Sequence, residues 1–241
     1  MSDFNYIEHY KKDAVEFDYF ENKKGATAHD ERRVREYVIS KVPKNVESIL
    51  DVGCGNGWAA KEFLPKGKQV FSLDISITNP SKAKTLYPSE NHFGITANSF
   101  FLPFDSNSID CVIASEIIEH VFDPAKFVKE LFRVLKKGGS LIVTTPYKEK
   151  LIYYLCVHCN KKTPANSHIH SFDENKLKSL YKENDLESFK FATFGNRLLI
   201  FLRTYVILKF FPFWLWKIKD KSVNFFFNKP VHIICIYKKK S

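Results

Sequence analysis

The chain has 241 residues, of which 44% are hydrophobic, 15% aromatic and 27% charged. This is the composition of a globular protein, and it excludes a disordered, collagenous or fibrous chain. The net charge of +10 is uneven, because residues 196–241 hold ten Lys or Arg and one acidic residue whereas residues 1–195 are nearly neutral. This distribution favours a contact between the basic C-terminal segment and an anionic partner over a protein whose whole surface binds nucleic acid.

Apolar strands and helices alternate along the first two thirds of the chain. A helix is predicted over 30–41, beginning at Asp30. Apolar runs then predict strands at 48–52, 69–73, 93–97, 109–114 and 140–145, with helices over 58–64, 81–86 and 124–136. A helix capped by Asp173 and strands at 188–194 and 231–237 follow. This alternation predicts a parallel sheet with helices on both faces.

Composition divides the chain into four parts. Residues 1–45 are predicted to be an N-terminal cap, and 46–195 a core with a Cys/His-rich insertion at 150–172. Residues 196–230 form an apolar, basic insertion, and 231–241 hold the final strand and a Lys tail. The five cysteines are odd in number and the first residues are polar, so we expect a reducing, cytoplasmic compartment without disulfides.

A glycine-rich turn closes the first strand. Residues 49–57 read Ile-Leu-Asp-Val-Gly-Cys-Gly-Asn-Gly, and glycines let a ligand lie against bare main chain. Asp74 ends the second strand, where a carboxylate can accept hydrogen bonds from both hydroxyls of a ribose. Trp58 stands where a dinucleotide-binding turn needs a small residue, which favours a nucleoside over a pyrophosphate. The alternative is a strand–helix turn that binds nothing.

This turn and Asp74, together with Leu102-Pro103-Phe104 and Arg133-Val134-Leu135-Lys136-x-Gly138-Gly139, resemble class I S-adenosylmethionine-dependent methyltransferases. The similarity is greatest to the type 11-like members that methylate small molecules, quinones and glycans. It covers roughly residues 30–195. The resemblance implies a doubly wound, mostly parallel seven-stranded Rossmann-like α/β sheet with the last strand antiparallel, an N-terminal helical cap and a C-terminal aromatic and basic insertion.

The resemblance also implies S-adenosylmethionine as cofactor and a role for each matching residue. Gly53 and Gly55 would pass under the methionine part, and Asp51 would contact its amino group. Asp74 would bind the ribose, and Ile75 would pack on the adenine ring. Asn98 would contact the adenine amino group, and Ser115 would line the pocket of the methyl donor. N-terminal aromatic residues, Tyr6 and Tyr10 among them, would close over the donor.

Glu116, Glu119 and His120 follow the fourth strand at a spacing that places them on one face of a helix. In the quinone O-methyltransferases that this segment resembles, carboxylates here can hold magnesium. His120 is instead a candidate general base for a substrate hydroxyl, with Glu116 as its catalytic partner. A third interpretation is that Glu119 and His120 only hold the loop in place. The sequence leaves the three open.

The Cys/His-rich insertion has the spacing of a structural zinc site. Cys156 and Cys159 form a Cys-x2-Cys pair, and His168 and His170 follow as His-x-His. Asn160 tolerates the left-handed turn that such a knuckle requires. The alternative is that small buried thiols and histidines line the substrate cleft without zinc.

Residues 198–216 are strongly apolar but are not predicted to span a membrane, because Arg203, Lys209 and Pro212 interrupt them and apparent sheet strands flank them. One interpretation places the segment on a bilayer surface. The residues expected at that interface are Trp214, Trp216 and 225–227, with Lys217, Lys219 and Lys221 on lipid phosphates. The other is a helical lid packed on the core or on a second subunit.

We therefore predict a methyltransferase that methylates an oxygen of a hydrophobic or lipid-linked small molecule or glycan precursor, at the inner face of the membrane. The main alternative is a soluble metabolite or nucleotide-sugar methyltransferase. An RNA methyltransferase is disfavoured, because residues 114–117 read Ala-Ser-Glu-Ile where a base pocket of Asn-Pro-Pro-Tyr type would stand. An inactive cofactor-binding relative is disfavoured by the intact glycine turn. The oligomeric state is left open.

Overall fold

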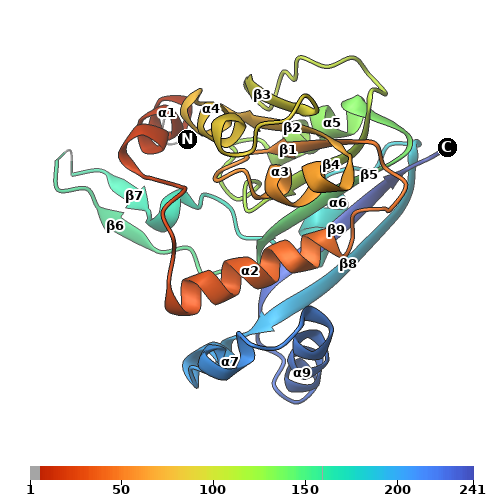
Figure 1. The fold of residues 1–241 in the computed structure, drawn as a ribbon. Helices are drawn as coiled ribbons and strands as arrows, with labels where there is room; N and C mark the ends of the chain where they lie inside the picture. The colour runs from red at the N-terminus through yellow and green to blue at the C-terminus, as the bar shows by residue number, and fades with distance from the viewer. Residues whose placement is uncertain (1–5, 159) are drawn as a thin grey trace.

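A computed structural model describes residues 6–158 and 160–241, with the backbone alone at Tyr6. Its centre is a seven-stranded sheet in the order β3-β2-β1-β4-β5-β9-β8 (Figure 1). The strands are β1 Ser48–Val52, β2 Gln69–Asp74, β3 His92–Thr96, β4 Ile109–Ser115, β5 Leu135–Pro146, β8 Leu186–Asn196 and β9 Pro230–Lys239. β1 to β5 pair in parallel, and β9 is antiparallel to both β5 and β8. The predicted fold class is confirmed.

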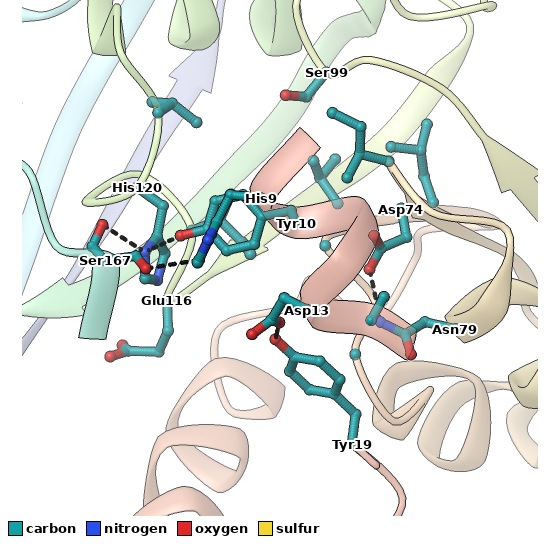
Figure 2. A pocket seen from close by; sticks show the side chains of 18 of the residues that line it. His9, Tyr10, Asp13, Tyr19, Asp74, Asn79, Ser99, Glu116, His120 and Ser167 are labelled. Carbon is teal, nitrogen blue, oxygen red and sulfur yellow. Dashed lines mark hydrogen bonds between the residues drawn. The ribbon is translucent and has the colours of Figure 1, made fainter. Parts of the chain in front are cut away.

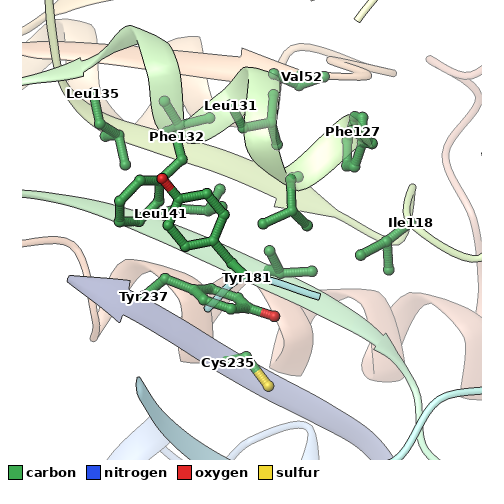
Figure 3. Packing of buried hydrophobic residues seen from close by; sticks show 14 of the residues in the cluster. Val52, Ile118, Phe127, Leu131, Phe132, Leu135, Leu141, Tyr181, Cys235 and Tyr237 are labelled. Atoms are coloured by element: carbon green, nitrogen blue, oxygen red, sulfur yellow. The ribbon is translucent and has the colours of Figure 1, made fainter. Parts of the chain in front are cut away.

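Helices cover both faces of the sheet, so that consecutive strand residues enter different cores. In β1, Leu50 packs into a cluster with α5, whereas Ile49 packs into a cluster with α2 and α3. The helices of this core are α2 Gly25–Ile39, α3 Trp58–Phe63, α4 Thr78–Leu86, α5 Pro124–Val134 and α6 Glu174–Ser179, and a 3-10 turn spans Leu64–Lys66. Figure 3 shows the α5 side, where Phe127, Leu131 and Phe132 are fully buried. A strand buried on both faces reads as a continuous apolar run, as β1 and β4 do.

Several helix boundaries differ from those predicted. The helix expected to begin at Asp30 begins at Gly25, and the Asp30 carboxylate instead accepts a hydrogen bond from His232 Nε2 at 2.9 Å. The helix expected to reach Lys136 ends at Val134, because Leu135 is already extended and pairs with Ile109. α4 begins three residues before the predicted start at residue 81. Asp173 caps α6 as predicted, its side chain accepting a hydrogen bond from the backbone N–H of residue 176.

Two segments outside the sheet cover the carboxyl ends of its parallel strands. One is α1, Tyr6–Glu16. The other is a two-stranded hairpin, β6 Tyr153–Leu155 and β7 Lys162–Pro164, followed by a 3-10 turn over Ala165–Ser167. Figure 1 shows both on the same side of the sheet. Asn160 has a φ of 54°, the left-handed conformation expected of it.

The C-terminal insertion forms three helices, α7 Arg197–Phe201, α8 Tyr205–Leu208 and α9 Phe213–Phe226, and packs against α2 away from those strand ends (Figure 1). Arg33 of α2 fastens it, donating hydrogen bonds to the carbonyls of Leu208 at 2.6 Å and Phe211 at 3.0 Å. The Arg33 guanidinium also lies over the ring of Trp216. Across the described parts of the chain, no helix is both long enough and apolar enough to cross a bilayer.

Candidate active site

A cavity of about 450 Å³ lies at the carboxyl ends of β1, β2 and β4. α1 covers it on one side and the segment after β7 closes another side, as Figure 2 shows around Tyr10 and Ser167. Its wall includes Tyr10, Asp13, Tyr19, Gly53, Gly55, Asp74, Ile75, Asn79, Ser99, Glu116, Ile117, His120 and Ser167. A concave site at the carboxyl edge of a parallel sheet is the usual place for a ligand in this architecture.

The glycine turn forms the floor of the cavity. Gly53 has a φ of 71° and Gly55 a φ of 48°, a region that glycine occupies without strain. A Cβ atom at Gly53 would lie 2.2 Å from Cδ1 of Ile117, so a larger residue would collide with the cavity wall. The ring of Tyr19 lies over Gly55, and the Tyr19 hydroxyl donates a hydrogen bond to Asp13. The turn is therefore bare main chain with an aromatic ring above it.

Asp74 lies in the wall at the end of β2. Its Oδ1 accepts a hydrogen bond from the backbone N–H of Ser76 at 3.1 Å, and Oδ2 accepts one from Asn79 Nδ2 at 3.2 Å. Each carboxylate oxygen can accept a second bond, so the group retains capacity for two hydroxyls of a ligand. Burial raises the pKa of Asp74. Ile75 follows it in the wall and offers an apolar surface.

Three residues predicted to hold the cofactor do not line the cavity. Asp51 is buried in β1, 1% exposed. The side-chain oxygen of Asn98 accepts a hydrogen bond from the backbone N–H of Phe100 at 3.0 Å, so this oxygen is engaged within its own loop. Ser99 lines the cavity instead. Ser115 bonds to the Thr144 hydroxyl at 2.8 Å inside the sheet. After β4, Glu116 and Ile117 line the cavity, and Ser115 does not.

His120 forms the centre of a hydrogen-bonded group on the far side of the cavity (Figure 2). Its Nδ1 lies 2.6 Å from the Tyr10 hydroxyl and 3.3 Å from the Ser167 carbonyl. The Ser167 hydroxyl bonds to His9 Nε2 at 2.8 Å. Burial and the neighbouring His168 lower the pKa of His120 to about 4, so its imidazole is neutral at pH 7. A neutral imidazole can accept a proton, which a general base requires.

Glu116 adds a carboxylate to this side. Its φ of 56° is unusual for a residue with a side chain, and it brings Oε2 to 3.5 Å from Nδ1 of His232. Although burial opposes its charge, Glu116 and Asp30 raise the pKa of His232 to about 10, so His232 is an imidazolium between two carboxylates. The other Glu116 oxygen, Oε1, is buried and has no hydrogen-bond partner in the described chain.

The candidate metal ligands are arranged differently from either prediction. Among the described residues, the group of His, Cys, Asp and Glu side chains close enough to share an ion is Glu119, His120 and His168, whose ligand atoms lie within 4.8 Å of one another. Glu116, which the magnesium hypothesis included, is not in it. Glu119 also stabilises the loop. Its Oε2 accepts a hydrogen bond from the Thr145 hydroxyl, and its backbone carbonyl accepts hydrogen bonds from the N–H groups of Ile169 and His170.

The predicted zinc ligands are not gathered in the part of the chain that can be described. Cys156 lies at the end of the hairpin and is half-buried, and it forms no such group with His168 or His170. His168 Nδ1 instead contacts Glu149 at 2.5 Å, and its ring packs on His120. Cys159 lies outside the described residues, so the four-ligand zinc hypothesis stays a prediction.

Comparisons with known proteins agree with this geometry. Residues 50–143 match the family model of a methyltransferase domain. A probable S-adenosylmethionine-dependent methyltransferase of Mycobacterium tuberculosis is 32% identical over 133 residues, which cover 55% of this chain and 46% of that protein. The ubiquinone biosynthesis O-methyltransferase of Rickettsia akari is 33% identical over 128 residues, covering 50% and 51%. The chain thus spans about half the length of these relatives.

Among solved structures, phosphoethanolamine N-methyltransferase 2 of Haemonchus contortus, in complex with phosphomonomethylethanolamine and S-adenosylhomocysteine, has a TM-score of 0.60 at 15% identity. The alignment covers 100% of this chain and 60% of that one, and it shows the shared fold. Residues 50–143 therefore form a methyltransferase domain, and the chain has the fold of the class I S-adenosylmethionine-dependent methyltransferases.

The residues present fit the cofactor of this family. A bare glycine floor, an aromatic ring over it and a carboxylate with spare acceptor capacity suit the methionine and ribose parts of S-adenosylmethionine. In β1, Asp51 Oδ2 is buried and has no hydrogen-bond partner among the described residues, and burial beside Asp74 raises the pKa of Asp51 to about 8. An unpartnered buried oxygen of this kind is what a nearby ammonium group would satisfy.

Sequence reasoning missed part of this methyltransferase cavity. Asn79, Ser99, Tyr19 and Ser167 carry no motif, and His232 lies 202 residues from its partner Asp30. Asn79 follows Asp74 by five residues, so the helix after the second strand was a local signal for it. Tyr10 was predicted to close over the donor, and its hydroxyl reaches His120. The side chain of Tyr6 lies outside the described residues.

Proposed function

We propose that the protein transfers a methyl group from S-adenosylmethionine to an oxygen atom of a hydrophobic or lipid-linked acceptor, either a small molecule or a glycan precursor. The observation that carries the proposal is the single cavity that joins the glycine turn and Asp74 to the Tyr10–His120 pair. S-adenosylmethionine supplies an electrophilic methyl group on a sulfonium. The protein must hold the donor, orient the acceptor, exclude water and remove one proton.

Asp74 and the glycine turn bind and orient the cofactor. Asn79 and the Ser76 N–H fix the Asp74 carboxylate, so its remaining lone pairs point from a rigid strand end. α1 excludes water by covering the cavity, and it is fastened through Asp18, which pairs with Lys82 of α4 at 2.6 Å. A covered site strengthens each electrostatic contact inside it.

The Tyr10–His120 pair moves the proton. The Tyr10 hydroxyl lines the cavity and contacts His120 Nδ1, and burial raises the pKa of Tyr10 so that it remains protonated. When the acceptor oxygen displaces the sulfur of the sulfonium from the methyl carbon and leaves S-adenosylhomocysteine, the acceptor proton would pass to Tyr10 Oη and the Tyr10 proton would pass to His120 Nδ1. The imidazole gains one proton and the phenol is restored. Glu116, fixed by His232, orients a second polar group of the acceptor.

An exposed apolar face supports the hydrophobic nature of the acceptor. On the insertion, Phe201, Phe210, Trp214, Phe225 and Phe226 are between 63% and 82% exposed. Monomeric soluble proteins seldom expose so many large apolar side chains within one short segment, and Lys219 and Lys221 of the same segment are also exposed. We propose that this face lies on an anionic bilayer surface, which brings the acceptor to the protein.

Two details of that surface differ from the sequence prediction. Trp216 is 3% exposed and packs on Arg33, so it cannot enter an interface with Trp214. Lys217 lies over the ring of Tyr37, where burial lowers the pKa of this lysine. In addition, none of the described residues of the insertion lines the cavity, which disfavours a lid over the active site.

The methyl-transfer test uses the purified chain, S-adenosylmethionine labelled in its methyl group, and extract divided into membrane-lipid, soluble-metabolite and RNA fractions. Label in the lipid fraction is the expected result. His120→Gln is expected to lower kcat about 10²- to 10⁴-fold, the usual contribution of a general base, while S-adenosylhomocysteine affinity changes less than about twofold. The control is His158→Gln, on an exposed residue outside the cavity. Label in the soluble fraction alone would overturn the hydrophobic acceptor.

The surface test measures co-sedimentation with vesicles of phosphatidylcholine and phosphatidylglycerol. Phe225→Ala with Phe226→Ala is expected to lower the partition coefficient at least about tenfold. The matched control is Phe101→Ala with Phe122→Ala, which removes two rings of similar exposure, 68% and 59%, from outside the insertion. Equal loss in both variants, or no binding by the unmodified protein, would overturn the bilayer contact.

A further inference from the structure

A second cavity, of about 250 Å³, lies between α2 and the C-terminal insertion. It shares no lining residue with the catalytic cavity. One side of its wall is polar and comes from α2 and α9, through His29, Arg33 and Asp220. The methyltransferase mechanism uses none of these three residues.

Each of these side chains has a buried polar atom without a partner. In the described chain, Arg33 Nε, Asp220 Oδ1 and His29 Nδ1 make no hydrogen bond. Arg33 and Asp220 are each only 1% exposed. A buried polar atom left unpaired is unfavourable, and the unpaired atoms of Arg33 and Asp220 at one cavity indicate that another group completes them.

The other atoms of the same residues are engaged, which holds the unpaired ones in place. Arg33 Nη1 donates to Glu36 at 2.7 Å, and Arg33 Nη2 donates to the Leu208 carbonyl. Asp220 Oδ2 accepts the backbone N–H of Gly195 at 3.1 Å. The polar side of the cavity therefore offers one N–H donor, at Arg33, and one oxygen acceptor, at Asp220.

The rest of the wall combines apolar side chains with Asp30 and the uncharged polar side chains of Thr27, Asn196, Thr204 and Tyr205. Leu208 and Trp216 lie inside it, and Ile200, 42% exposed, stands at its edge. Beside Ile200 in sequence, Phe201 is 81% exposed and belongs to the apolar outer face of the insertion.

We propose that the second cavity binds a single-chain amphiphile with an uncharged hydroxyl head group. The hydroxyl would accept the N–H of Arg33 Nε and donate to Asp220 Oδ1, and the chain would pack on Leu208 and Trp216. A hydroxyl is the smallest group that both donates and accepts. An anionic head group would face Asp220 and Asp30, which line the wall, and an ammonium would leave Arg33 Nε unpaired and meet its charge. The inference does not rest on methyl transfer.

The test is calorimetric titration of the full chain with octan-1-ol, octanoate and octylammonium, without acceptor or vesicles. We expect saturable binding of octan-1-ol at one site per chain, at least about tenfold tighter than either charged analogue. Leu208→Trp, which fills the cavity, should weaken it at least about tenfold. The matched control is Leu202→Trp, on a side chain that is 58% exposed and does not line the cavity. S-adenosylhomocysteine binding reports that each variant is folded.

If Leu208→Trp fails to bind S-adenosylhomocysteine, Ile200→Trp at the edge of the cavity takes its place, with the same expectation. Equal binding of octan-1-ol by the cavity-filling variant and the control would overturn the proposal, and so would octanoate binding as tightly as the alcohol. Absence of saturable binding would also overturn it and would leave water as the group that completes these atoms. None of these outcomes depends on whether the protein methylates a lipid.

Discussion

The catalytic cavity and the C-terminal insertion are built by different kinds of contact. The cavity is assembled by short segments at neighbouring strand ends, such as Gly53–Gly55 after β1 and Asp74–Asn79 after β2. The insertion is held by contacts between residues far apart in the chain, such as those of Arg33 with the carbonyls of Leu208 and Phe211. Contacts within a short segment leave a local sequence pattern, whereas contacts between distant residues do not. The cavity floor could therefore be predicted from the sequence, and the packing of the insertion could not.

The largest effect should come from the two tryptophans that sequence reasoning treated alike. Trp216→Ala is expected to lower the free energy of unfolding by about 3–5 kcal/mol, because the side chain is 3% exposed and packs on Arg33 and Phe213. Trp214→Ala should change it by no more than about 0.5 kcal/mol, because that side chain is 63% exposed. Urea unfolding followed by circular dichroism measures both. Similar losses in the two variants would mean that the insertion is not packed as described.

At the catalytic end, Asp74→Ala should weaken S-adenosylhomocysteine binding about a hundredfold or more, since a hydrogen bond to a charged group contributes about 1.5–3 kcal/mol and two are removed. Asn98→Ala is the matched comparison, because Asn98 was predicted to contact the cofactor but turns its oxygen to its own loop. The affinity of Asn98→Ala for S-adenosylhomocysteine should stay within about threefold of that of the unmodified protein. Calorimetry with S-adenosylhomocysteine distinguishes the two, and a greater loss at Asn98 would show that the adenine lies elsewhere.

The sequence predicted the sheet and the glycine floor because both follow from local rules. Apolar runs of five to seven residues specify buried strands, and glycines after the first strand specify the turn. Asn98 and Ser115 do not line the cavity, because a motif specifies only a stretch of chain and local hydrogen bonds decide which side chain faces the cavity. Their contact with the cofactor stays a prediction. His232 could not be predicted, since its partners come from α2 and from the residue after β4.

The contacts of His232 with Asp30 and Glu116 exist only in the folded chain, and the pH dependence of stability tests them. The folded pKa of His232, about 10, lies above the ordinary value of 6.5, so the stabilisation is fully present below pH 6.5 and is lost as the pH rises toward 10. The charged groups around it are Asp30, Glu116 and Asp220. His232→Gln should lower the free energy of unfolding by about 2 kcal/mol at pH 6, and the difference from the unmodified protein should shrink toward pH 10. A difference independent of pH would show that His232 acts by packing on Phe194 alone.

The smallest effect is expected from removing divalent metal. Burial and the nearby Glu116 hold the pKa of Glu119 well above its usual value, which favours the uncharged carboxyl and opposes the binding of a cation. One nitrogen of His120 is already engaged by Tyr10, and His168 by Glu149. Dialysis against a chelator should therefore leave the rate of methyl transfer to the identified acceptor within about twofold. Zinc or magnesium added back is the control. If activity falls and one of these ions restores it, Glu119, His120 and His168 form a metal centre, and the proton must then leave the acceptor at the metal instead of through Tyr10.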